Sequence, residues 1–101
     1  MRKHSTQLTV GMDLGDKKHW MTILDEAGEI VEVATCTNTA RRVDEFFLRF
    51  PAPSEVTVAM ESGTHSPWLS RLLDKMGFRV LVGDAYDPFR EQNRWRKRKA
   101  A

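Results

Sequence analysis

Cysteine is nearly absent from this sequence, which has 101 residues and one cysteine, Cys36. A single cysteine cannot form an internal disulfide, and this favours a reducing compartment. We expect Cys36 to be a buried or strand-end residue rather than a catalytic thiol. Long apolar runs are missing too, since no stretch approaches the roughly 20 residues that span a bilayer. No apolar segment follows the basic N-terminus, so we expect a cytoplasmic protein without membrane contact.

The sequence also has no internal repeat and little room for a second domain. With 101 residues, of which 41% are hydrophobic, it should form one small globular unit that buries about 60–70% of the unfolded chain's surface. We expect an N-terminal extension over 1–6, an α/β domain over 7–83 and a basic, irregular or degenerate tail over 84–101.

The formal net charge of +2 hides an uneven distribution. Residues 90–101 hold six basic residues and one acidic residue, whereas the rest of the chain holds ten basic and thirteen acidic residues. A basic end on a mildly acidic body favours a polyanion partner that binds through the end. An aromatic residue among cations suits nucleic acid, and the candidate contacts are Arg94, Trp95, Arg96, Lys97, Arg98 and Lys99. A solvated tail is the alternative interpretation.

The hydrophobic pattern changes period along the chain and thereby predicts the order of the elements. Period-two alternation predicts strands over 7–14, 18–24, 29–35, 55–61 and 78–82. An apolar stripe at helical spacing, Val43, Phe46, Phe47 and Phe50, predicts a helix that begins at an Asn38 or Thr39 N-cap and ends before Pro51. A second stripe, Leu69, Leu72, Leu73 and Met76, predicts a helix between a Ser66 N-cap and Gly77.

The resulting order, β-β-β-α-β-α-β, restricts the possible sheet topology. Short turns join the first three strands into an antiparallel meander, and right-handed crossovers then place the later strands beside the first. We expect a mixed five-stranded sheet of order 3-2-1-4-5, the ribonuclease-H-like (RuvC-like) arrangement, with both helices on one face.

Two acidic residues, Asp13 and Glu61, end the first and fourth expected strands, each directly before a glycine-containing turn. The bulky residues of both strands should pack under the helices, which leaves the two acids together on the opposite face. Carboxylates in such a position repel each other unless a cation or a proton lies between them. Mg²⁺ is the expected occupant, because it takes one or two carboxylates together with waters and phosphate oxygens. Two solvated strand-end acids are the alternative.

For other residues near this pair, we weigh a role at the site against an ordinary structural role. His19 could approach the acids from the second strand, and Thr64 and His65 could touch a substrate from the turn after Glu61. Strand, loop and cap roles are at least as well supported for all three. We expect Trp20 and Trp68 in the core rather than as stacking platforms.

Three segments, Val10–Lys17, Ile23–Val31 and Met60–Trp68, resemble the N-terminal domain of DEDD transposases, the insertion-sequence transposases of the one-hundred-and-ten type. The resemblance implies a RuvC-like fold whose four acids, Asp, Glu, Asp and Asp, hold Mg²⁺ for DNA recombination. It also implies a serine nucleophile on a separate C-terminal domain and a guide RNA derived from the element. Asp13 matches the first acid of the family and Glu61 the second.

The sequence departs from the family pattern from about Gly83 onward. The last two acids of the family lie in a Lys-Ser/Thr-Asp-Arg-x-Asp-Ala motif, which these 101 residues lack; Asp84 and Asp87 fall too early. We therefore expect an N-terminal fragment of a transposase that carries half of the magnesium site and is inactive alone. The uncovered face of the sheet should also favour self-association.

Two other functions remain open from the sequence. One is a non-catalytic remnant that binds nucleic acid or oligomerises through the basic tail, with salt-sensitive binding that disappears without residues 90–101. The other is a fragment of an actin-like kinase, which also opens with an Asp-x-Gly hairpin. The segment from Glu61 to Trp68 argues against the kinase.

Overall fold

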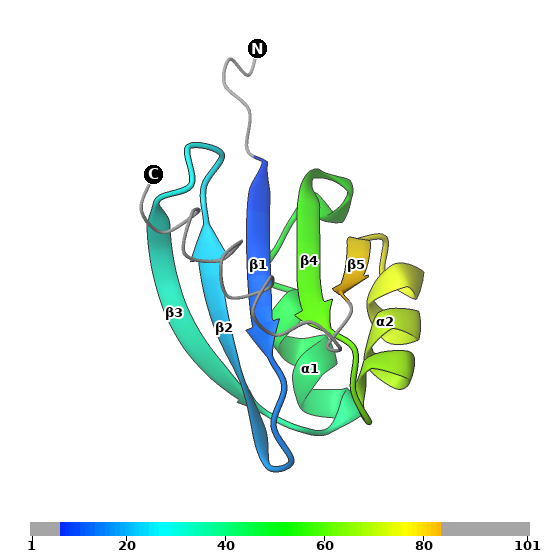
Figure 1. The fold of residues 1–101 in the computed structure, drawn as a ribbon. Coiled ribbons are helices and arrows are strands. Elements are labelled where there is room, and N and C mark those ends of the chain that lie inside the picture. Colours follow the sequence, from blue (N-terminus) through cyan, green and yellow to red (C-terminus); the bar gives the residue numbers. More distant parts are fainter. Residues whose placement is uncertain (1–6, 84–101) are drawn as a thin grey trace.

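The computed structural model describes residues 7–83 and contains the expected elements in the expected order (Figure 1). They are β1 (Leu8–Asp13), β2 (Lys18–Leu24), β3 (Ile30–Thr37), α1 (Ala40–Phe47), a 3-10 turn η1 (Pro53–Glu55), β4 (Val56–Glu61), α2 (Ser66–Lys75) and β5 (Arg79–Gly83). The extension over 1–6 and the basic tail over 84–101 lie outside the described residues. None of the helices in 7–83 has the length and apolar character needed to cross a membrane.

The five strands form one mixed sheet in the order β3-β2-β1-β4-β5. β1 pairs antiparallel with β2 and parallel with β4, so that Leu8 lies opposite Val56 and Met12 opposite Met60. β5 continues the parallel half of the sheet beside β4. The predicted ribonuclease-H-like α/β topology is confirmed.

The core lies between one face of the sheet and both helices. Val10, Met12, Val58 and Met60 are buried on alternate positions of the two central strands, as the period-two pattern predicts. Phe47 of α1 and the α2 residues Leu69 and Leu73 belong to the same cluster of buried side chains. Figure 1 shows α1 behind the sheet and α2 beside β5. The other face of the sheet, here the open face, carries no helix of residues 7–83.

The ends of α1 follow local hydrogen bonding rather than the apolar stripe. Thr39 is the N-cap, because its side chain accepts a hydrogen bond from the Arg42 N–H. The helix ends at Phe47, before the predicted end at Pro51. After the helix, backbone hydrogen bonds that span three residues, such as Phe50 N–H to the Phe47 carbonyl, form a turn. The helix does not continue because Phe50 precedes Pro51, and a residue before proline avoids the helical conformation. Phe50 is nevertheless buried.

The ends of α2 are close to those predicted. Ser66 is the first helical residue and His65 occupies the N-cap position, so the predicted Ser66 N-cap is one residue too late. Gly77 ends the helix with φ of 102°, a conformation that glycine adopts without steric cost.

The prediction that Trp20 lies in the core is wrong, because this residue lies on the open face of the sheet. This side chain is 50% exposed instead of buried in the core. The reason is the strand register, which pairs Trp20 with Asp13 and with Thr35 and so places it on the face without helices. Trp68, by contrast, is partly buried and packs against the core.

Candidate functional site

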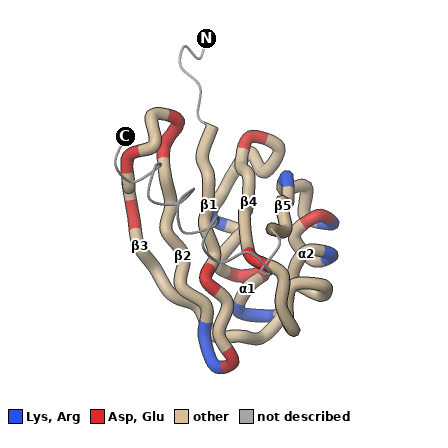
Figure 2. Tube along the Cα trace, in the orientation of Figure 1, with Lys and Arg blue, Asp and Glu red and all other residues tan. Residues whose placement is uncertain are grey.

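Asp13 and Glu61 are the last residues of two adjacent parallel strands. Met12 and Met60, which precede them, are paired in register and point into the core. Successive side chains on a strand point to opposite faces, so Asp13 and Glu61 lie side by side on the open face. Both are exposed, and Figure 2 shows acidic residues at these ends of β1 and β4.

Neither acid has a counterion within the described part of the chain. No hydrogen bond or ion pair joins the Asp13 or Glu61 side chain to another residue of 7–83. Their neighbours toward the middle of the sheet are Gly11 and Ala59, which are paired in register and have small side chains. The two carboxylates thus lie exposed at the ends of the strands without a charged partner among residues 7–83.

The donor set fits a magnesium ion that keeps most of its water. Mg²⁺ is a hard cation that binds one or two carboxylates and completes its octahedron with waters or phosphate oxygens. Within 7–83, no cluster of three His, Cys, Asp or Glu side chains could hold a metal ion. The two acids therefore suit a magnesium site that is completed by waters or phosphate oxygens, rather than a site closed by residues 7–83 alone.

The turn after Asp13 requires glycine and is held by a hydrogen bond to the His19 side chain. A Cβ atom at Gly15 would collide with the Lys18 carbonyl oxygen. The Gly15 N–H donates a hydrogen bond to Nδ1 of His19, over 3.2 Å. The Asp-x-Gly sequence thus allows the chain to reverse tightly just after the first acid.

The turn after Glu61 is held by its own hydrogen bonds. The Ser62 N–H donates to the Gly83 carbonyl at 2.8 Å, which extends the pairing of β4 with β5 beyond Glu61. The Gly63 N–H donates to Oγ of Ser66, whose hydroxyl donates back to the Gly63 carbonyl. Each acid is therefore followed by a turn with a defined path.

A buried histidine and an asparagine connect these turns. His19 is fully buried, and its Nε2 lies 2.8 Å from Oδ1 of Asn38. The Asn38 amide group donates to the Asp16 carbonyl at 2.9 Å. Because Nδ1 of His19 accepts from Gly15, its Nε2 carries the proton that Asn38 accepts. Burial lowers the pKa of His19; the hydrogen bond to Asn38 opposes this shift, and nearby His65 adds to it.

His65 links the same network to the second turn. Its Nε2 lies 3.3 Å from the Asn38 amide nitrogen and 3.6 Å from Oδ1 of Asp16. The Trp68 indole N–H donates to its Nδ1 over 3.2 Å. The structure therefore gives His19 and His65 supporting roles below the acids, whereas Thr64 is exposed. The sequence suggested Asn38 only as a helix cap, because its three contacts come from distant segments.

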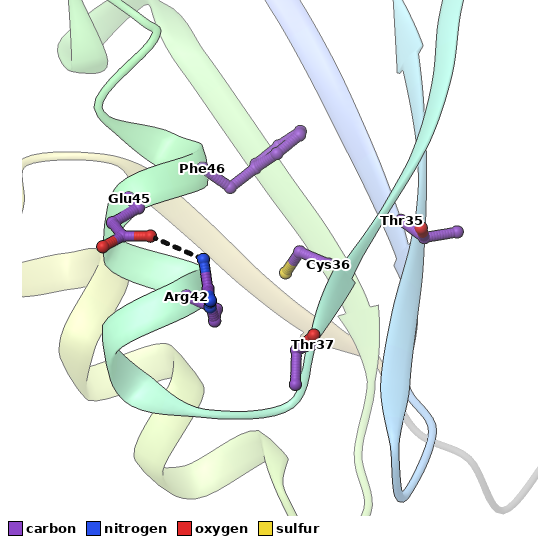
Figure 3. Close-up of a pocket in the computed structure, with 6 residues that line it drawn as sticks. All are labelled: Thr35, Cys36, Thr37, Arg42, Glu45 and Phe46. Atoms are coloured by element: carbon purple, nitrogen blue, oxygen red, sulfur yellow. Dashed lines mark hydrogen bonds and ion pairs between the residues drawn. The ribbon is translucent and has the colours of Figure 1, made fainter.

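A separate hollow on the other face of the sheet does not belong to this site. Its volume is about 350 Å³, and it lies between β3 and α1 (Figure 3). The side chains that line it are Thr35, Cys36, Thr37, Arg42, Glu45 and Phe46. Burial raises the pKa of the Cys36 thiol, which disfavours the reactive thiolate at neutral pH. This fits the predicted structural role of Cys36.

The sequence comparison assigns a family to this arrangement. Residues 10–100 match the family model of DEDD transposases of the IS110 type, described as transposase. No curated protein matches the chain. The candidate contacts Arg94, Trp95, Arg96, Lys97, Arg98 and Lys99 lie within the matched range but outside the described residues. Since the match covers most of the sequence, the chain belongs to the DEDD transposases of the IS110 type.

Proposed function

We propose that Asp13 and Glu61 are the first two ligands of the magnesium site of a DNA transposase. The observation that carries this proposal is the in-phase placement of two exposed carboxylates at the ends of adjacent parallel strands. Neither forms an ion pair within the described residues, which is the state expected of metal ligands before the metal binds. The resemblance to the four-acid family site supports the same two residues.

The chemistry of such a site is phosphodiester cleavage and transfer. Asp13 and Glu61 would hold the ion through their carboxylate oxygens. When bound there, Mg²⁺ would supply polarisation of the scissile phosphate and stabilisation of the charge that develops on it. His19 and Asn38 hold the turn after Asp13 and so keep the first acid in place beside the second.

These 101 residues hold two of the four acids that the family resemblance implies. We infer that the chain alone does not cleave DNA, since the second pair of ligands is missing from its sequence. The proposal includes DNA as substrate, a structured RNA as guide and association of the chain with itself. The basic residues near the C-terminus favour nucleic acid as a partner in either case, catalytic or not.

Metal binding at the acid pair can be tested with Mn²⁺, a paramagnetic substitute for Mg²⁺. We expect Mn²⁺ to broaden the backbone amide signals of Asp13 and Glu61 in NMR spectra before those elsewhere. Asp13→Asn and Glu61→Gln should each weaken this binding by about 10-fold or more, as the loss of a carboxylate ligand predicts. Glu26→Gln, which removes an exposed carboxylate in the β2–β3 turn, is the matched control.

Two results would contradict the proposal. Broadening that is spread over all acidic residues would mean that the pair has no special affinity for the metal. Magnesium-dependent DNA cleavage by the purified chain, lost in the Asp13→Asn variant, would instead show that two acids suffice for activity.

A further inference from the structure

An exposed tryptophan lies on the open face of the sheet next to the first acid. Trp20 is 50% exposed and is the register partner of Asp13 across the antiparallel β1–β2 pair. Opposed residues in such a pair have their Cβ atoms about 4.5–5.5 Å apart and on one face. The indole ring therefore stands beside the candidate metal site.

Two lysine residues lie near the Trp20 ring. Nζ of Lys18 lies over Trp20, 5.1 Å from the ring centroid, and Lys17 precedes it in the turn. Figure 2 shows the basic residues of this turn at the end of the β1–β2 hairpin. Acidic Asp16 and Asp13 lie in the same region, so the positive charge is local to the aromatic ring rather than general.

The residues around the ring on this face are mostly polar. The residues that share the open face with Trp20 on β2 and β3 include Thr22, Thr35 and Thr37, and Gly11 lies across from Thr22. Exposed aliphatic residues of this half of the sheet are Ile30, Val31 and Val33 on β3, of which Val33 is paired with Thr22 and lies diagonally across from Trp20. Trp20 thus has Asp13 and Thr35 as its cross-strand partners, Val33 diagonally across on β3 and the Lys18 ammonium group over its ring. The cation over an exposed aromatic ring favours a ligand that combines an aromatic group with a negative charge.

We propose that Trp20 and Lys18 bind an unpaired nucleotide of a single strand that runs to the Asp13–Glu61 site. The base stacks on the exposed indole, and the phosphate beside it contacts the Lys18 ammonium group. Stacking on an aromatic side chain is worth about 1–3 kcal/mol per base and tolerates any base sequence. The inference rests on the proposed function for the direction of the strand, toward the acids. DNA and RNA share this chemistry.

The test measures binding of fluorescein-labelled single strands by fluorescence anisotropy in EDTA, so that no metal contributes. The probes are oligothymidylate and oligouridylate of about 12 nucleotides, a length within the site sizes of single-strand binding proteins. Trp20→Ala should weaken binding about 5- to 150-fold, which is the stacking energy expressed as an affinity ratio. Trp20→Phe should retain most of the affinity, because it keeps an aromatic ring.

Leu81→Ala is the matched control, since Leu81 is also an exposed apolar residue on the open face, at the β5 end. Its affinity should equal that of the unchanged chain. Binding through the basic C-terminal residues weakens with salt, so the measurement is repeated at two salt concentrations. The Trp20→Ala ratio should persist at both, because stacking depends little on screening.

Three results would overturn the inference. They are equal affinity of the Trp20→Ala and Leu81→Ala variants, no binding of either probe by the unchanged chain, and a Trp20→Ala variant that loses self-association but keeps its oligonucleotide affinity. The last would assign Trp20 to an interface between copies of the chain. The ratio of the thymidylate and uridylate affinities identifies DNA or RNA as the preferred strand. Because EDTA is present, a failure of the metal site leaves this result intact.

Discussion

The His19 imidazole is buried and makes hydrogen bonds through both ring nitrogens. Its Nδ1 accepts from the backbone of the turn after Asp13, and its Nε2 donates to Asn38. This arrangement is complete only in the neutral ring, because a proton on Nδ1 would face the Gly15 N–H. The single residue therefore couples its protonation state to the path of the turn.

The stability of the chain should fall in mild acid because of His19. Burial lowers its pKa below the ordinary value of 6.5, so folding favours the neutral form. The contribution of neutral His19 to the free energy of unfolding is fully present above about pH 6.5. It is lost as the pH falls from there through the lowered pKa of the folded state. Urea unfolding monitored by circular dichroism between pH 7.5 and 5.5 measures the loss.

The comparison variant is His19→Gln, which keeps a polar side chain but does not titrate in this range. It should be less stable at pH 7.5 and should show a flatter dependence on pH. Equal pH dependence of the two proteins would mean that another group is responsible.

Single residues also show why part of the site could not be predicted. The period-two pattern correctly placed His19 and Trp20 on opposite faces of β2, but it does not say which face the helices cover at that strand. A general preference of tryptophan for cores then gave the wrong side. The contact of His19 with Asn38 joins segments without any periodic relation, so no sequence pattern indicated it.

The elements themselves were largely predictable, because their signals are local. Alternation gave all five strands within two residues at either end, and Thr39 and Gly77 marked the predicted boundaries of the helices. The early end of α1 was missed because the apolar stripe continues to Phe50 after the helical hydrogen bonds have stopped. Burial and helicity are separate properties there, and the stripe reports only burial.

The end of α2 supports a prediction about backbone strain. Gly77 has φ of 102°, and a Cβ atom there would make only an ordinary contact with Pro53, at 3.5 Å. Gly77→Ala should thus lower the free energy of unfolding by about 1–2 kcal/mol through backbone conformation alone. Chemical denaturation measures the change.

Gly63→Ala is the matched control for this prediction. Gly63 does not have a positive φ, and a Cβ atom there would meet no other atom within 4 Å. This variant should be neutral or slightly stabilised, by up to about 1 kcal/mol, because alanine restricts the unfolded chain. Similar destabilisation in both variants would argue against a strain specific to Gly77.

At the scale of the whole molecule, the described sheet has helices on one face and the edge strands β3 and β5. β3 is an edge strand of eight residues with exposed Ile30, Val31 and Val33. Edge strands with exposed apolar side chains tend to pair with other chains. The overall topology followed from crossover handedness and was predictable, whereas the cluster of exposed apolar side chains on β3 was not.

Self-association through this apolar part of β3 predicts a concentration-dependent sedimentation coefficient. Val33→Lys should reduce the dependence, because a charge on an edge strand opposes pairing with a second copy. Leu48→Lys alters a similarly exposed residue at the end of α1 and should leave it unchanged. A compact, highly stable monomer at all concentrations would contradict the prediction.

The parallel pairing of β1 with β4 also sets the order in which the molecule can fold during synthesis. The β1–β2–β3 meander uses neighbouring segments and can close as soon as Thr37 has left the ribosome. The partner of β1 on its other side, Val56–Glu61, is made later, and pairing across such a separation forms slowly. Asp13 is therefore translated before Glu61 and gains its neighbour only after the second half of the domain has emerged. Until then, one edge of β1 is available to any other nascent strand near by.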